Sequence, residues 1–347
     1  MKYTSLSLLG FKSIKPGAYP VETLKKFIVS NLYQSNLKQI HTSNLISIDS
    51  KGMSIVDLNG IRRLKLESRE TFRVNIPDKG YLTPPVHTTT GMCIRLKDGG
   101  YVRCGINRSN GGRVEADVSI PADIDTYIEA HYFGPRTNPR TLDVYVNGVK
   151  VKSVSLSGTE SDGFYLGLWS SSGNPPNDAY VSDIYIAANV NQGSSEIPLL
   201  GPIVVEEGMV NVVDGKGWMT GVNQKPTLEE LNEVINGELG GSGDFELTSI
   251  TSGGYNQPLS CTFIPPDGDN FIGVAVNINL THDEALANAT VVFKNGASGG
   301  SLTTPVTDKK SVNTNISAAF LHNGDGVTNE SIKEATLTIT PAEIPKG

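Results

Sequence analysis

An Asn-Gly dipeptide between two alternating segments most strongly constrains how this chain can fold. Residues 142–146 alternate apolar and polar side chains, Asn147 and Gly148 interrupt the pattern, and residues 149–154 alternate again. Both central residues of a type I′ turn need a positive φ, which asparagine and glycine adopt most easily. The segment therefore predicts a β-hairpin.

Strand patterns continue on both sides of this hairpin. Residues 164–169 and 179–186 read as two further strands, and Asp-Gly-Gly and Asn-Gly-Gly turns separate earlier ones. Between residues 44 and 188 about a dozen strands are expected, which is too many for a single flat sheet. The economical solution is a β-sandwich of two packed antiparallel sheets.

Three of these segments resemble a known family. Residues 144–148 read Val-Tyr-Val-Asn-Gly, residues 163–168 read Gly-Phe-Tyr-Leu-Gly-Leu, and residues 181–186 read Val-Ser-Asp-Ile-Tyr-Ile. Their succession resembles the concanavalin A-like, or laminin G-like, jelly roll, and the resemblance covers residues 44–188. It implies the fold and leaves the activity open, because lectins, glycan hydrolases and structural modules share this fold.

The segment before the jelly roll, residues 1–43, is expected to form an N-terminal arm with a short helix. Its apolar side chains fall on one helical face at Leu24, Phe27, Ile28 and Leu32. Two readings follow from this pattern. The helix packs on its own domain, or the arm docks on a neighbouring subunit.

The segments after the jelly roll are a linker and a second domain. Residues 189–243 are expected to contain short strands and a helix that Thr227 caps and Gly237 ends. Residues 244–347 show six strand patterns, the size and number typical of an immunoglobulin-like sandwich. The predicted fold class is therefore mainly β: a concanavalin A-like jelly-roll sandwich followed by a smaller immunoglobulin-like β-sandwich, with short N-terminal and linker helices.

Composition narrows the function classes. The 37 glycines and 19 prolines are typical of an all-β chain with many turns. The net charge of −7 argues against a nucleic-acid-binding surface and against a membrane-surface role. No apolar run approaches the roughly 20 residues of a membrane helix. We therefore expect no nucleic-acid partner and no membrane insertion.

The N-terminal sequence and the cysteines indicate the cellular compartment in which the chain folds. Two serines interrupt the apolar run of residues 1–11, so no signal peptide is predicted and the segment is expected to belong to the mature protein. Cys93 and Cys104 could face each other across a hairpin, but Cys261 would be left over. Free buried thiols in a reducing cytosol are the expected state.

Signatures of catalysis are lacking in the sequence. The five histidines are scattered without metal-ligand spacing, and neither a Gly-x-Ser-x-Gly elbow nor a Glu-x-Asp-x-x-Glu strand occurs. Glu115 and Asp117 alternate on one strand face, which indicates solvated surface. We therefore expect no catalytic residue, no metal, no cofactor and no enzymatic activity.

The loop of residues 169–180 is the best candidate for a ligand site, because loops on rigid sandwiches often carry function. An aromatic face with amide and carboxylate groups suits a sugar, and the alternative is that Trp169 is core and the rest a polar turn. His131 and Arg136, before the hairpin, are possible neighbours. The candidate residues within the loop are Trp169, Asn174, Asn177, Asp178 and Tyr180.

These observations together predict a non-enzymatic bacteriophage virion structural protein, a tail- or capsid-attached appendage or decoration subunit made in the host cytoplasm. Its expected partners are portal, tail or capsid subunits, reached through the N-terminal arm, and host-surface glycans. A homo-oligomer is also expected. The alternatives are a lectin-like carbohydrate-binding protein of a bacterium and, third, a glycan-cleaving enzyme.

Overall fold

The computed structural model divides the chain into two compact units. The first contains residues 1–12 and 16–205, and the second contains residues 13–15 and 206–347. The residues described are 5–32, 46–49, 53–67, 71–77, 87–134, 139–157, 161–168, 178–189, 197–221, 223–238, 250–252, 254, 256–268, 270–280, 285–292, 300–303, 314–320 and 327–343.

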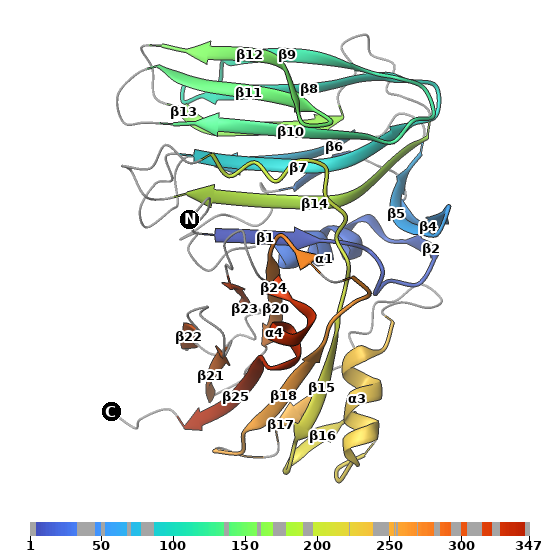
Figure 1. The fold of residues 1–347 in the computed structure, drawn as a ribbon, viewed down its shortest axis with the longest axis vertical. Helices are drawn as coiled ribbons and strands as arrows, with labels where there is room; N and C mark the ends of the chain where they lie inside the picture. The colour runs from blue at the N-terminus through green and yellow to red at the C-terminus, as the bar shows by residue number, and fades with distance from the viewer. Residues whose placement is uncertain are drawn as a thin grey trace. The chain divides into compact units, whose positions relative to one another are not determined.

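Two antiparallel sheets build the first unit (Figure 1). The large sheet has the strand order β12-β11-β10-β7-β14-β5-β4-β2, with β1 also paired to β14. Its strands are β1 (Ser5–Leu9), β2 (Gly17–Tyr19), β4 (Met53–Leu58), β5 (Ile61–Leu66), β7 (His87–Leu96), β10 (Thr126–Phe133), β11 (Arg140–Val146), β12 (Val149–Leu156) and β14 (Ala179–Asn189). The small sheet has the order β3-β6-β13-β8-β9. Its strands are β3 (Ile46–Asp49), β6 (Thr71–Pro77), β8 (Gly100–Arg108), β9 (Arg113–Ile120) and β13 (Ser161–Leu168).

The core of this unit lies between the two sheets. Side chains alternate along each strand, so even-numbered residues of β7 and β10, such as Met92 and Ile128, point inward and are fully buried. Across the core, Tyr132 of β10 stacks on Phe164 of β13 with ring centroids 5.1 Å apart. The prediction of a mainly β protein with a β-sandwich is confirmed.

The predicted hairpin is formed by β11 and β12, at one edge of the large sheet. Asn147 and Gly148 have φ values of 48° and 80°, as a type I′ turn requires. The Asn147 side chain also accepts a hydrogen bond of 2.8 Å from the backbone N–H of Tyr127, which ties the turn to β10.

The N-terminal segment packs within the first unit. Strand β1 pairs with β14, and helix α1 (Val21–Leu32) lies against β1 and β3. Leu24, Ile28 and Leu32 of this helix are fully buried. These contacts are those of a helix packed on its own domain, and docking of the arm on another subunit stays a prediction.

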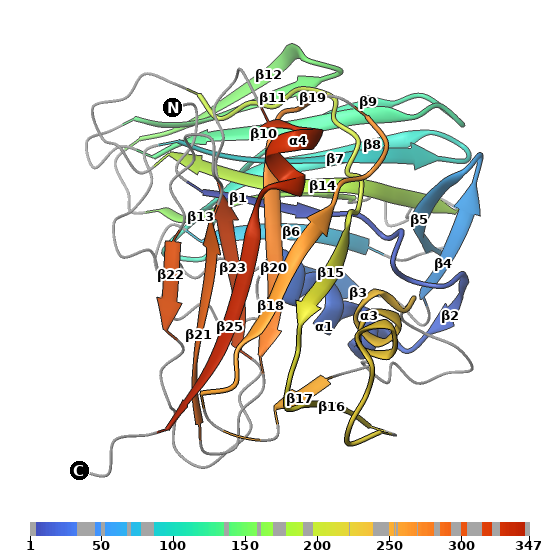
Figure 2. The ribbon, with the colours of Figure 1, turned by 60° about the horizontal axis from the view of Figure 1, so that its bottom comes forward.

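The second unit is also mainly β (Figure 2). Its main sheet has the order β15-β18-β25-β21-β22. The elements are β15 (Met209–Asp214), β16 (Trp218–Thr220), α3 (Leu228–Asn236), β17 (Ile250–Ser252), β18 (Leu259–Ile264), β19 (Asn270–Phe271), β20 (Val274–Leu280), β21 (Ala285–Val292), β22 (Gly300–Thr303), β23 (Thr314–Phe320), β24 (Val327–Thr328), α4 (Asn329–Lys333) and β25 (Thr336–Glu343). The predicted linker helix is confirmed as α3, where Thr227 and Glu230 form a capping box. The immunoglobulin-like assignment stays a prediction.

Within the described residues, no helix is both long and apolar enough to span a membrane. The three cysteines are free thiols; Cys104 and Cys261 are buried, as expected, whereas Cys93 is partly exposed. Cys93 lies on the large sheet and Cys104 on the small one, so the two are not hairpin partners.

Candidate functional site

The structure describes three of the seven predicted ligand residues. Trp169, Asn174, Asn177 and Arg136 lie outside the described residues.

The three described residues fall at two ends of the large sheet. Tyr180 of β14 pairs in register with Arg95 of β7, whereas His131 of β10 pairs with Thr89 of the same strand. Arg95 and Thr89 are six residues apart, which is roughly 20 Å along a strand. Asp178, just before Tyr180, forms ion pairs with two lysines near the same end. His131 is therefore not brought together with the other two.

His131 belongs to a surface that we call the polar face. It is the side of the large sheet that points away from the small sheet, formed by odd-numbered residues of β7, β10 and β11 together with Tyr185 of β14. Cross-strand register arranges these residues in rows. One row contains Asp143, His131 and Thr89, and the next contains Tyr145, Glu129, Gly91 and Tyr185.

His131 is the buried centre of the first row. Its side chain is 3% exposed, and its Nε2 lies 3.0 Å from Nδ1 of His87. Burial, and then the neighbouring His87, lowers the pKa of His131 to about 4, so the imidazole is neutral at pH 7. Among the described residues, neither His131 Nδ1 nor the buried Thr89 Oγ1 has a hydrogen-bond partner. Two buried polar atoms of this row thus lack a partner among the described residues, which is uncommon in a protein interior.

Asp143 is the partly exposed end of this row. Its carboxylate accepts hydrogen bonds from Lys150 Nζ at 2.7 Å and Ser153 Oγ at 2.6 Å, both on β12. Burial acts to raise the pKa of Asp143, but these two bonds outweigh it and the net pKa is lowered. The carboxylate therefore stays ionised as a hydrogen-bond acceptor at neutral pH.

Two partly exposed aromatic side chains flank this row along the strand direction. Tyr145 of β11 lies in the neighbouring row, and Phe133 of β10 lies on the other side of His131. Phe133 stacks on His87 with centroids 4.8 Å apart, and His87 in turn stacks on His131. The result is a partly exposed polar row with an aromatic ring on each side.

The second row is covered by the chain itself. Glu129 is 1% exposed and accepts a short hydrogen bond from the Tyr185 hydroxyl and another, 2.9 Å long, from the backbone N–H of Gly201. Leu200 N–H donates to the Tyr185 hydroxyl at 3.3 Å, and Val205 N–H donates to Asp183 Oδ1 at 2.8 Å. Residues 200–205, which we call the strap, therefore lie over this part of the polar face (Figure 1).

Burial, and then the charge of Glu129, raises the pKa of Tyr185 well above its ordinary value. Tyr185 therefore keeps the proton that it donates to Glu129.

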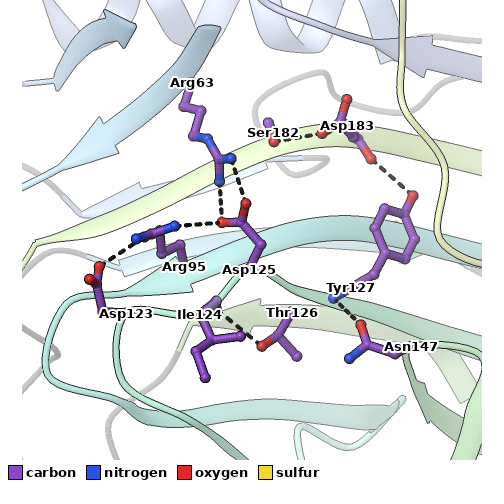
Figure 3. Close-up of polar contacts among 10 residues, drawn as sticks. All are labelled: Arg63, Arg95, Asp123, Ile124, Asp125, Thr126, Tyr127, Asn147, Ser182 and Asp183. Atoms are coloured by element: carbon purple, nitrogen blue, oxygen red, sulfur yellow. Dashed lines mark hydrogen bonds and ion pairs between the residues drawn. The ribbon is translucent and has the colours of Figure 1, made fainter. Parts of the chain in front are cut away.

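An ion-pair cluster at the end of the polar face fixes the start of β10 (Figure 3). Arg63, fully buried, donates two parallel hydrogen bonds of 2.6 and 2.8 Å to Asp125. Arg95 bonds Asp123 at 2.8 Å and approaches Asp125 at 3.5 Å. The hydrogen bond from Arg63 lowers the pKa of Asp125. Both carboxylates are paired with arginines, so we assign the cluster to structure, although Arg63 Nε has no hydrogen-bond partner among the described residues.

The outer face of the small sheet carries a second charged group. Arg103 pairs with both Glu115 and Asp117, and the Tyr165 hydroxyl donates to Glu115. The guanidinium of Arg73 lies 4.0 Å above the Tyr165 ring. Glu115 and Asp117 are thus partly exposed and ion-paired with Arg103.

Sequence reasoning identified His131 and missed Asp143, Tyr145, Phe133 and Glu129. The signal was present in β10, where Tyr127, Glu129 and His131 alternate with inward-facing residues. The contribution of β7 and β11 depends on register between distant segments, which the pattern of one strand does not give.

The chain matches no protein-family model and no curated protein. Among solved structures it is similar to the alginate lyase Aly36B, with 11% identity, a TM-score of 0.32, and coverage of 56% of this chain and 98% of that one. It is also similar to an endo-β-1,4-glucuronan lyase from the fungus Trichoderma reesei (12% identity, TM-score 0.30, coverage 45% and 95%). A third is a family 16 carbohydrate-binding module (16% identity, TM-score 0.23, coverage 39% and 84%).

Two of these three structures are enzymes. This finding contradicts the expectation that the chain has no enzymatic activity, which we withdraw. The bacteriophage virion assignment, with its subunit partners, has no counterpart in these structures and stays a prediction.

Proposed function

We propose that this chain is a carbohydrate-binding protein and that it binds glycans on the exposed part of the polar face. The residues that would contact the ligand are Asp143, Tyr145, Phe133 and Lys150, with His131 beneath them. The observation that supports this most is the neutral, buried His131, whose Nδ1 has no partner among the described residues, in a row bounded by two aromatic rings.

The arrangement suits the chemistry of a sugar ring. Sugars present hydroxyl groups around the rim and C–H groups on the faces. The Asp143 carboxylate accepts hydrogen bonds from hydroxyls, and the Lys150 ammonium donates them. Because His131 Nε2 is paired with His87, the imidazole offers one nitrogen, Nδ1, whose role as donor or acceptor depends on the tautomer. Tyr145 and Phe133 supply the apolar area that binding sites need besides a few placed polar groups.

The charge balance favours a neutral glycan over a uronate polymer. Lys150, the cationic side chain of the proposed site, already forms an ion pair with Asp143 at 2.7 Å. A uronate carboxylate would have to compete with Asp143 for this ammonium and would lie near a second negative charge. Hydroxyl groups meet no such repulsion.

The test is calorimetric titration of the chain with cello-, xylo- and manno-oligosaccharides, beside an oligouronate of equal length. We expect binding of a neutral series, with the affinity of Tyr145→Ala and Asp143→Asn reduced about tenfold, which corresponds to about 1.4 kcal/mol. Tyr101→Ala is the matched control, because Tyr101 is 53% exposed and lies on the small sheet. Absence of binding, or equal binding by all variants, would remove the proposal.

A further inference from the structure

The second row of the polar face begins at Tyr145 in the proposed site and continues beneath the strap. Tyr145, the aromatic residue of the proposed site, pairs in register with Glu129, Glu129 with Gly91, and Gly91 with Tyr185. The row therefore runs from β11 across β10 and β7 to β14 without interruption. It ends, as it begins, with a tyrosine, and a carboxyl group lies between the two.

Gly91 makes room for this row. A Cβ at position 91 would lie 2.3 Å from Cε1 of Tyr185 and 3.1 Å from Cε1 of Tyr127. Both rings therefore occupy the space beside the backbone of β7 that the side chain of any residue other than glycine would fill. The aromatic surface on this part of the sheet depends on a glycine at that position.

The strap donates hydrogen bonds to this row and to Asp183 through backbone N–H groups. Its N–H groups donate to Tyr185, Glu129 and Asp183, and a side chain at Gly148 would lie 3.8 Å from Pro202. The strap forms no strand pairing, and Val204 within it is 68% exposed. Among the described residues, the Glu129 carboxylate accepts hydrogen bonds from the Tyr185 hydroxyl and from the Gly201 backbone N–H. The hydroxyl groups of a sugar can donate hydrogen bonds to a carboxyl and a phenol just as these backbone N–H groups do.

We propose that the row from Tyr145 to Tyr185 is the continuation of the glycan site, and that the strap is an internal occupant which a longer glycan displaces. This inference rests on the proposed function and adds to it a dependence on ligand length. Tyr145 and Tyr185 lie three strands apart, roughly 14 Å. A disaccharide held at Tyr145 and Asp143 leaves the strap in place, whereas a hexasaccharide reaches beneath it.

Gly201 allows a clean test. It has a φ of +74°, and a Cβ there would have no atom within 4 Å, so Gly201→Ala strains the closed strap without a steric clash. Gly111 is the matched control, since its φ is +84° and its Cβ position is equally open, but it lies in the β8–β9 turn of the small sheet.

Disaccharides and hexasaccharides of the cello, xylo and manno series would be titrated into the full chain and both variants. Gly201→Ala should bind the hexasaccharide of the preferred series roughly fivefold tighter, because strain in the closed strap lowers the free energy of opening it. Its affinity for the disaccharide should not change, and Gly111→Ala should match the unmodified chain for both. Amide hydrogen exchange of residues 200–205 should become faster with the hexasaccharide and stay the same with the disaccharide.

Two results separate the claims. If the disaccharide binds and Gly201→Ala alters neither hexasaccharide affinity nor strap exchange, the strap is not a competitor and the inference is overturned while the proposed function stands. If no oligosaccharide of any length binds, the proposed function is overturned and the inference with it.

Discussion

The imidazoles of His87 and His131 are stacked with ring centroids 5.2 Å apart, and His87 Nδ1 lies 3.0 Å from His131 Nε2. A single proton lies between two nitrogens at this distance, so one ring donates and the other accepts. Burial and this neighbour together keep the pKa of His131 near 4. His131 is therefore a source of acid sensitivity in the large sheet.

The first prediction concerns stability against pH. An unfolded histidine takes up its proton near pH 6.5, whereas folded His131 does so only near pH 4. The unfolded state thus binds more protons between these values, and the free energy of unfolding should fall by up to about 3 kcal/mol as pH drops from 6.5 to 4. Urea unfolding at half-unit pH intervals measures this slope.

The control for this slope is His131→Gln, which keeps a polar side chain but cannot titrate. The titratable groups that act on His131 are His87, Asp143 and Lys150, and all three remain in the variant. A slope that is the same in the variant as in the unmodified chain would assign the acid sensitivity to other groups.

A second prediction concerns the Arg63–Asp125 pair. Arg63 is fully buried, so removal of its guanidinium leaves the Asp125 carboxylate without its main partner. Since the Asp125 side chain is 40% exposed and water can replace part of the interaction, we expect Arg63→Ala to lower the free energy of unfolding by roughly 2–3 kcal/mol. Arg95→Ala removes a partner of the same cluster whose side chain is 17% exposed and whose contact with Asp125 is longer, at 3.5 Å, so it should have a smaller effect. Equal losses in both variants would show that burial of Arg63 does not matter.

A third prediction concerns Gly91. Replacement by alanine places a methyl group against the rings of Tyr185 and Tyr127, which must move. We expect Gly91→Ala to lower the free energy of unfolding by roughly 1–3 kcal/mol, as overpacking of a core does. Gly221→Ala, where a Cβ meets nothing within 4 Å, should stay within about 0.5 kcal/mol of the unmodified chain. Denaturant titration compares the two, and an unchanged midpoint for Gly91→Ala would contradict the packing described.

Local signals predicted local structure well. The Asn147-Gly148 turn and the Thr227 cap were recognisable because each depends on the conformational preference of one or two residues. The polar face was not, because its rows combine β7, β10, β11 and β14, which are far apart in the sequence. The strap was hidden for a further reason. It bonds through its backbone N–H groups, which every residue except proline has, so its side chains carry no signal.

The most direct test of the account is the imidazole ¹H–¹⁵N spectrum of His131, recorded while the neutral hexasaccharide that binds best in the calorimetric panel is added. We expect the His131 ring signals and the amides of β10 and β11 to shift with ligand concentration, while amides of β8 and β9 on the small sheet do not. Shifts confined to the small sheet, or binding that leaves His131 unchanged, would contradict the assignment of the polar face as the glycan site.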